Sequence, residues 1–409
     1  MSDAYLVPLL LPQSIVKKFE EIQPQKHHRL LSLQKPSTET LVLVPSERCN
    51  LHCSYCYEQH KNPQKMTFQT AKIAVQRAFF ELGSNKTLKI EFRGGEPFLE
   101  FDLIKQICEW SINTYPKDSI SFYAITNGTC FHEELKQWLK KHKENFIVPL
   151  SIDGDRSTQN HNRSNSFDLI DFDFFLRTWH CPCCITTILP DNVTSVFHDL
   201  QFLMIKGFNI RVNFEFTREW TDAQLEQLAL GLKRFADYLL SIQSTNRINL
   251  FSYSSILDYS IVKNKDEANR RRHFLACNAG RYRKLVVANG SIYPCQAFVP
   301  SVFEMSSSLT AGDIFDKLKH EDLHPKKCCY CNFFNLCHIC PGFSLGHAGN
   351  FKWRNPSLCK ITKLRTFLSA YYWCNRMLDE KTKISLQSDD IELLKAAIAD
   401  LYRGEGIYA

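Results

Sequence analysis

The sequence Cys49-Asn50-Leu51-His52-Cys53-Ser54-Tyr55-Cys56 places three thiols within one short stretch, just after an apolar run that ends at Val44. Three thiolates that converge from one loop can bind three irons of a 4Fe-4S cluster and leave the fourth iron open to a ligand. A zinc site is the alternative, and it would need a fourth ligand such as His52 or His60. The ligand count favours the iron-sulfur cluster.

Length and composition narrow the class of protein around this stretch. The chain has 409 residues, is 44% hydrophobic and 23% charged, and carries a net charge of +7. These values indicate a globular protein, and the mild positive charge forms no long basic stripe that would imply nucleic acid. No apolar run is long enough to cross a bilayer, and the N-terminus lacks the basic flank of a secretory signal. We therefore expect a cytoplasmic protein in which the 17 cysteines serve metal or cluster binding rather than disulfides.

Apolar runs alternate with amphipathic helical patterns from Thr40 to about Ile242, which is typical of strand-helix units around a parallel sheet. The predicted strands are Leu41-Val44, Leu88-Phe92, Ile120-Ile125, Ile147-Ile152, Cys184-Leu189 and Ile210-Phe216. Helices are predicted after Thr67, over Phe101-Tyr115 and over Thr221-Leu240. The fold class is therefore α/β, a partial barrel of six strand-helix units, with its functional loops at the carboxyl ends of the strands.

The pattern changes after Leu250, where a cysteine-rich segment follows with too few periodic apolar residues to form much of a core. Metal binding is the expected source of its stability. The predicted organisation is an N-terminal extension (1–39), the barrel (40–250), the cysteine-rich domain (251–372) and a C-terminal helical segment (373–409), with a helix expected over Ile391-Leu401.

A second motif, Phe92-Arg93-Gly94-Gly95-Glu96-Pro97, ends the second predicted strand. The glycines allow close approach to the backbone, and Glu96 offers a carboxylate to an amino group. Such a turn is common by itself, but its place one strand after the cysteine loop makes it informative.

With both motifs in place, the chain resembles the radical S-adenosylmethionine (radical SAM) enzymes. The resemblance implies that Cys49, Cys53 and Cys56 bind a 4Fe-4S cluster whose open iron chelates S-adenosylmethionine. The turn at Gly94, Gly95 and Glu96 would then receive the amino group of that cofactor.

Further cofactor contacts follow from the same resemblance. Tyr55 would contact the adenine, Ser151 in Ser151-Ile152-Asp153-Gly154 the ribose, and Arg163 the carboxylate, unless Arg163 is an ordinary loop residue. The reaction implied is reductive cleavage of S-adenosylmethionine to a 5′-deoxyadenosyl radical, which removes a hydrogen atom from the substrate.

Seven more thiols follow in an order that packing does not explain. They are Cys277, Cys295, Cys328, Cys331, Cys337, Cys340 and Cys359. Asn289-Gly290 predicts a hairpin turn between Lys284-Val287 and Ser291-Tyr293. A pair of zinc ribbons is the alternative interpretation of the Cys-x-x-Cys pairs.

The order of these thiols resembles the SPASM extension of radical SAM enzymes that modify peptides, which carries two auxiliary 4Fe-4S clusters, so that three clusters are expected in all. The resemblance assigns Cys277, Cys295 and Cys340 to the first auxiliary cluster, and Cys328, Cys331, Cys337 and Cys359 to the second. Cys337 and Cys340 are one residue closer than is usual. Because Arg270 to Ala276 contains no thiol, we expect the first auxiliary cluster to have an iron open to substrate, solvent or a ligand such as His273.

The remaining cysteines have no comparable pattern. Cys181, Cys183 and Cys184 open a strand whose alternate residues face opposite sides, which favours structural thiols over a metal site. Cys108, Cys130, Cys329 and Cys374 are expected to pack.

The resemblance implies an enzyme that matures a ribosomally made precursor peptide by a carbon-carbon, thioether or ether crosslink. The expected partners are that peptide with its leader, a separate leader-binding protein, and an electron donor such as flavodoxin or ferredoxin. One alternative is the anaerobic sulfatase-maturating type, which oxidises Cys or Ser to formylglycine. Another is a non-catalytic iron-sulfur or zinc-ribbon redox protein, in which Glu96 and Tyr55 would have no purpose.

Overall fold

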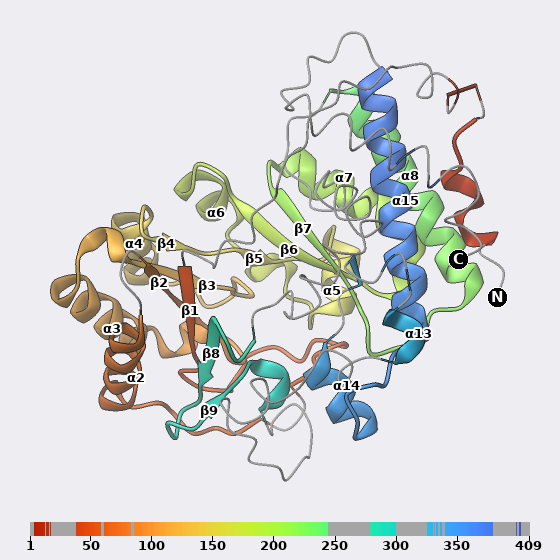
Figure 1. Ribbon diagram of the computed structural model, residues 1–409. Helices are drawn as coiled ribbons and strands as arrows, with labels where there is room; N and C mark the ends of the chain where they lie inside the picture. The colour runs from red at the N-terminus through yellow and green to blue at the C-terminus, as the bar shows by residue number, and fades with distance from the viewer. Residues whose placement is uncertain are drawn as a thin grey trace, which may run out of the picture.

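The chain is built around a mainly parallel β-sheet that turns through a partial barrel, as a computed structural model shows (Figure 1). The structure describes residues 4–12, 14–15, 17, 38–58, 61–82, 86–243, 279–299, 325–329, 331, 333, 336–337, 340–378, 398 and 401. The barrel strands are β1 (Thr38–Leu43), β2 (Thr87–Phe92), β3 (Ile120–Ala124), β4 (Phe146–Ile147), β5 (Leu150–Ser151), β6 (Cys183–Ile188) and β7 (Asn209–Phe214).

The six predicted strands are confirmed, with one difference. The expected strand Ile147-Ile152 is split into β4, which pairs with β3, and β5, which pairs with β6. Pro149 lies between them and has no N–H to donate, so a continuous ladder is interrupted there. A parallel bridge between Thr126 and Leu150 joins the two parts of the sheet.

Helices follow the strands and cover the outer face of the sheet (Figure 1). They are α2 (Phe68–Glu81), α3 (Phe101–Thr114), α4 (Glu133–His142), α5 (Arg156–Asn162), α6 (Phe172–Thr178), α7 (Val196–Lys206) and α8 (Asp222–Ser241), with 3-10 turns η2 (Pro97–Glu100), η3 (Lys117–Ser119), η4 (Phe167–Leu169) and η5 (Pro190–Ser195). Thr67 caps α2 by accepting from the Thr70 N–H, and Thr221 forms a capping box with Gln224 at the start of α8. The predicted helix starts are therefore correct.

The hairpin β8 (Arg283–Val286) and β9 (Ile292–Tyr293) forms as predicted, with Gly290 at φ +87° in the turn. Its place in the fold was not predicted. Strand β8 runs parallel to β1 and extends the barrel sheet to the order β4-β3-β2-β1-β8-β9. Val42 and Val44 pack there against Leu285 and Val287, which holds the start of the cysteine-rich region against the first barrel strand.

The remaining described elements are η7 (Gln296–Phe298), α13 (Lys326–Cys329), α14 (Pro341–Ala348), α15 (Pro356–Leu378) and the N-terminal turn η1 (Ala4–Leu9). Helix α15 lies along α8, and η1 packs beside both (Figure 1). Tyr5, Leu6 and Leu9 are buried there, so part of the N-terminal extension packs on the barrel. The boundary expected at 372/373 falls within α15, while most of the helix expected over Ile391-Leu401 lies outside the described residues.

None of the helices in the described part of the chain combines the length and the apolar character that crossing a bilayer requires.

Candidate functional site: a cysteine loop at the mouth of the barrel

The loop that carries Cys49, Cys53 and Cys56 leaves the carboxyl end of β1, and all three thiols are half-buried. Burial raises the pKa of the Cys53 thiol, the Arg163 guanidinium lowers it, and the neighbouring Cys56 and Cys49 raise it again. The three sulfurs therefore lie within electrostatic range of one another. The Leu51 N–H also donates to the Cys49 sulfur at 3.4 Å.

Helix α5 and the loop after it hold the cysteine loop from one side. The Ser54 N–H donates to the Asn162 carbonyl at 2.9 Å, and the His52 N–H donates to the Ser164 hydroxyl at 2.8 Å. Ser164 has a positive φ of 54°, a conformation that is uncommon for a residue other than glycine. These contacts fix the backbone between the thiols.

The Gly94-Gly95 turn holds the cysteine loop from the other side. A Cβ on Gly94 would lie 2.1 Å from the Ser46 carbonyl oxygen, and one on Gly95 would lie 2.3 Å from the Arg48 carbonyl oxygen. The close approach that these glycines allow is therefore made by the chain's own cysteine loop. Any contact between this turn and a cofactor stays a prediction.

Glu96 is 1% exposed, and its carboxylate accepts three hydrogen bonds. The donors are the Thr126 hydroxyl at 2.7 Å, the Asn127 N–H at 2.7 Å and the Phe98 N–H at 3.2 Å. Burial raises the pKa of Glu96 to about 7 despite these donors. Glu96 thus joins the ends of β2 and β3, and Asn127 continues the contact by donating to the Asn50 side chain at 2.9 Å.

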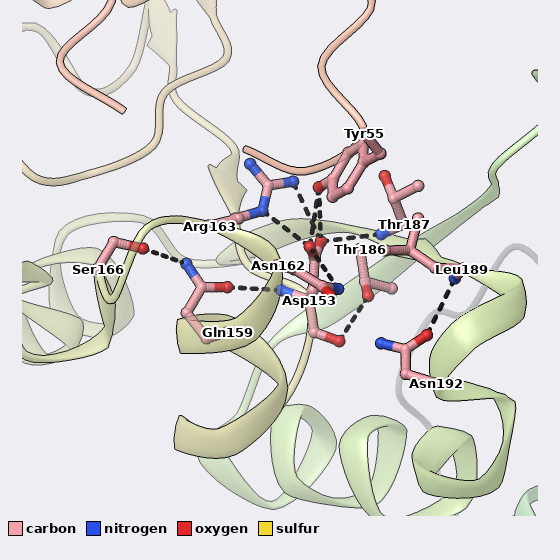
Figure 2. Close-up of polar contacts among 10 residues, drawn as sticks. All are labelled: Tyr55, Asp153, Gln159, Asn162, Arg163, Ser166, Thr186, Thr187, Leu189 and Asn192. Atoms are coloured by element: carbon pink, nitrogen blue, oxygen red, sulfur yellow. Dashed lines mark hydrogen bonds and ion pairs between the residues drawn. The ribbon is translucent and has the colours of Figure 1, made fainter. Parts of the chain in front are cut away.

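Asp153, which follows β5, is the centre of a buried polar network (Figure 2). Its carboxylate accepts from the Tyr55 hydroxyl at 2.8 Å, from Asn162 Nδ2 at 3.1 Å and from the Thr187 N–H at 3.1 Å. Arg163 Nε lies 3.0 Å from Asp153 Oδ2, and its guanidinium stacks 5.2 Å from the centre of the Tyr55 ring. Asp153 therefore ties the cysteine loop to β6 and to the end of α5.

Two residues of this network, Arg163 and Tyr55, are predicted to contact the cofactor, and both contact Asp153 in the structure. Arg163 is only 8% exposed and so is not a surface residue, and its guanidinium is paired with Asp153. Burial raises the pKa of Tyr55 well above its usual range, with its hydroxyl on the same carboxylate. Ser151 is 9% exposed and pairs in register with Ile185 of β6. The contacts of these three residues with S-adenosylmethionine stay predictions.

In the cysteine-rich region, Cys295 and Cys340 precede two helical turns that pack together. Cys295 precedes η7, and Cys340 caps α14, its sulfur accepting from the Phe343 N–H at 3.4 Å. A Cβ on Gly342 would lie 2.8 Å from the Phe298 ring, so α14 sits directly against η7. This contact holds the two helical turns together, and the assignment of Cys295 and Cys340 to one cluster stays a prediction. Cys277 lies outside the described residues.

The four cysteines assigned to the second auxiliary cluster also gather. Burial raises the pKa of Cys337 to about 12, Thr362 lowers it, and the charges of Cys359, Cys331 and Cys328 raise it. Cys328 lies in α13 and Cys359 in the first turn of α15. Cys337 therefore lies within electrostatic range of the other three thiols, and their assignment to one cluster stays a prediction.

The donor chemistry fits iron-sulfur clusters at the cysteine loop and near α13 and α15. Within the described ranges, no three Cys, His, Asp or Glu side chains converge closely enough to hold a single metal ion. Thiolates of a cubane bind different irons and so need not converge on one point. The assignment of these thiols to clusters stays a prediction.

A buried contact joins the cysteine loop to Cys295. Gln296 Nε2 donates to Glu58 Oε1 at 2.6 Å, and Glu58 is 4% exposed. Burial and the nearby Glu47 raise the pKa of Glu58 to about 7. The sequence did not predict this contact, because a single Glu and a single Gln that lie 238 residues apart form no recognisable pattern.

The other cysteines are placed mostly as expected. Cys108, Cys184 and Cys374 are in the core, Cys183 faces the other side of β6, and Cys181 is exposed, so the Cys181–Cys184 set is split as predicted. Cys130 is half-buried, and the charges of Glu96 and Cys49 raise its pKa beyond the effect of burial, so it lies nearer the cysteine loop than expected. The side chain of Cys329 lies outside the described residues.

Comparison with known proteins connects this geometry to a family. The 4Fe-4S single cluster domain family matches residues 40–169. A cysteine-type anaerobic sulfatase-maturating enzyme of Clostridium novyi is 25% identical over 74% of this chain and 87% of its own length. The radical SAM cyclopropyl synthase TigE of Paramaledivibacter caminithermalis is 20% identical over 84% of this chain and 77% of its own. An uncharacterized protein of Methanocaldococcus jannaschii is 32% identical over 41% of this chain, which spans 59% of that relative.

Two solved structures share the fold. Native anSMEcpe with bound AdoMet and Cp18Cys peptide aligns with a TM-score of 0.60 at 19% identity, over 82% of this chain and 98% of that one. Streptococcus suis SuiB bound to precursor peptide SuiA aligns with a TM-score of 0.51 at 15% identity, over 85% of this chain and 86% of that one. The partial barrel with its cysteine-rich extension is therefore a fold that both of these proteins have.

Proposed function

We propose that this chain, which is a radical SAM enzyme of the SPASM type, modifies a side chain of a ribosomally made peptide. The observation that carries the proposal is the cysteine loop at the barrel mouth, held between the Gly94-Gly95 turn and the Asp153 network and joined to Cys295 through Glu58 and Gln296. A loop fixed at this many points can hold a reactive group in one orientation over the barrel.

The three predicted sets of cysteines would hold the cofactors. Cys49, Cys53 and Cys56 would hold the cluster that binds S-adenosylmethionine, and the two later sets would hold auxiliary clusters. When bound, these groups supply a 5′-deoxyadenosyl radical that removes a hydrogen atom from the substrate, and an acceptor for the second electron that bond formation releases. The chain's own residues orient the loop and exclude water, since Glu96, Asp153 and Arg163 are all less than a tenth exposed.

The reaction we propose first is a crosslink between two side chains of a precursor peptide, by a carbon-carbon, thioether or ether bond. The similarity to the cyclopropyl synthase and to the peptide-bound fold neighbour supports it. Its partners would be the peptide with its leader, a separate leader-binding protein, and flavodoxin or ferredoxin as electron donor.

Oxidation of Cys or Ser to formylglycine is the second candidate. The similarity to the sulfatase-maturating enzyme favours it. That match covers 87% of the relative's length, whereas the match to the cyclopropyl synthase covers 77% of that relative's length.

The test is anaerobic turnover with S-adenosylmethionine, reductant and candidate peptides, read by mass spectrometry. Loss of a pair of hydrogen atoms with all side-chain heteroatoms retained, at two joined residues, indicates a crosslink. Exchange of a cysteine sulfur for a carbonyl oxygen, or loss of two hydrogen atoms at a single serine, indicates formylglycine. Failure to form 5′-deoxyadenosine under any reducing condition would contradict both candidates.

A further inference from the structure

The inner face of β2 carries charge, although the strand lies within the sheet. Leu88, Ile90 and Phe92 enter the core on one side. The alternate residues Lys89, Glu91 and Arg93 therefore face the other side, which is the barrel lumen. The register places Glu91 beside Val42 of β1, and Val42 beside Leu285 of β8.

Glu91 is 1% exposed and is surrounded by cations. Arg93 Nε lies 2.5 Å from Glu91 Oε1, Arg283 makes two contacts of 3.0 Å to both oxygens, and Lys89 Nζ lies 3.9 Å away. Burial alone would raise the pKa of Glu91, but Arg93 and Arg283 hold it at about 2. Glu91 thus faces three cations, an excess of positive charge that Glu58, within electrostatic range of Arg93, reduces.

A fourth cation, Arg211 of β7, adds to this excess from across the lumen. Its side chain is exposed. Burial lowers the pKa of Lys89, Glu91 raises it, and the charges of Arg283, Arg93 and Arg211 lower it further. These cations repel one another, and the charge of Glu91 offsets part of that repulsion.

Two of these cations border a cavity of about 210 Å³ beside the cysteine loop. Arg93 and Arg283 line it together with Tyr57, which follows the third cluster thiol, and Cys295. A group bound by the two guanidinium groups would therefore lie between the predicted site of radical formation and the first auxiliary thiols.

We propose that Arg93 and Arg283 bind a carboxylate of the peptide substrate, either an acidic side chain or the C-terminus, and so place the neighbouring residue for hydrogen abstraction. Planar guanidinium groups match a carboxylate with paired hydrogen bonds, and convergent cations in a walled cavity attract an anion. The inference rests on the proposed function, because it assumes that the ligand of this cavity is a peptide.

The test is binding without turnover. The full chain, reconstituted with its clusters and held oxidised with S-adenosylmethionine, is incubated with three random hexapeptide pools. One pool has a fixed Asp and an amidated C-terminus, one has Asn in place of Asp, and one has Asn with a free C-terminal carboxylate. Retention measured by affinity selection should be roughly tenfold higher for one acidic pool than for the neutral pool. The preferred pool identifies the source of the carboxylate.

Variants separate the proposal from a loss of folding. Arg283→Gln should abolish the preference, whereas Glu91→Gln should increase it several-fold, because the internal competitor is gone and misfolding produces no gain. Arg177→Gln removes the same charge from an 80% exposed side chain of α6 and should leave the preference unchanged.

The outcomes also separate this inference from the proposed function. Equal retention of all pools by an enzyme that still forms 5′-deoxyadenosine and alters peptides would overturn the carboxylate site alone. So would a change only in S-adenosylmethionine affinity, measured by equilibrium dialysis without peptide, since the cations would then serve the cofactor. A clear acidic preference in a protein that never cleaves S-adenosylmethionine would overturn the proposed function instead.

Discussion

Replacing Asp153 by Asn tests whether the buried network holds the cysteine loop in place. Asp153 is 3% exposed and Arg163 is 8% exposed, so the substitution leaves a guanidinium buried without its counter-charge. Breaking a buried pair by removing one partner costs about 3 to 5 kcal/mol. Because Asn still accepts hydrogen bonds from Thr187 and Tyr55, we expect the lower end, roughly 3 kcal/mol.

The assay is urea unfolding of the anaerobic protein, run as a double-mutant cycle with Arg163→Gln. The double variant should lose roughly 2 kcal/mol less than the sum of the two single variants, because neither charge is then left alone. Asp168→Asn is the matched control, since Asp168 pairs with Arg156 at a surface where both side chains are more than half exposed. It should cost less than about 1 kcal/mol.

Two results would refute this reasoning. One is an Asp153→Asn variant no less stable than the Asp168→Asn control. The other is additivity of the Asp153 and Arg163 substitutions, which would mean that the pair does not act as a unit. Hydrogen exchange across residues 49–56 should also rise in Asp153→Asn, because Tyr55 loses its charged acceptor.

Three further predictions follow from the same contacts. Gly95→Ala should lower the iron retained after reconstitution, because its Cβ would lie 2.3 Å from the Arg48 carbonyl oxygen; iron content equal to wild type would contradict this. Burial raises the pKa of Asp199 to about 6, so the folded state binds the proton more tightly and the free energy of unfolding falls as pH rises from about 4 to 6. In unfolding experiments at several pH values, Asp199→Asn should remove roughly 3 kcal/mol of that dependence. An unchanged dependence on pH would count against this prediction. Gln296→Ala should lower the free energy of unfolding by about 1 to 3 kcal/mol and speed hydrogen exchange in residues 292–298, because Glu58 would lose a buried hydrogen-bond partner. Unchanged exchange would show that this contact does not hold the hairpin.

The barrel was predictable because its signals are local. Each strand is an apolar run bounded by turn residues. Thr67 and Thr221 are N-cap residues that mark the starts of α2 and α8. The thiol spacing from Cys49 to Cys56 is equally local. What the sequence did not reveal are pairings between distant segments, such as β8 on β1, because strand register depends on partners that the local pattern does not name.

The site shows the same division. The alternation Lys89, Glu91, Arg93 against Leu88, Ile90 and Phe92 was visible in the sequence and would have indicated a polar lumen. Asp153 lies within the motif Ser151-Ile152-Asp153-Gly154, in which only Ser151 was predicted to have a role. Its role as an acceptor for groups from three segments depends on the folded chain, as does the Glu58 contact with Gln296.

The most direct test of the account is the content of iron, acid-labile sulfide and zinc per chain after anaerobic reconstitution. We predict about twelve iron and twelve sulfide with no zinc, which corresponds to three 4Fe-4S clusters. About four of each would contradict the auxiliary clusters and leave a radical enzyme with a single cluster. Zinc without sulfide would contradict the central claim, that the thiols from Cys49 to Cys56 hold an iron-sulfur cluster at the mouth of the barrel.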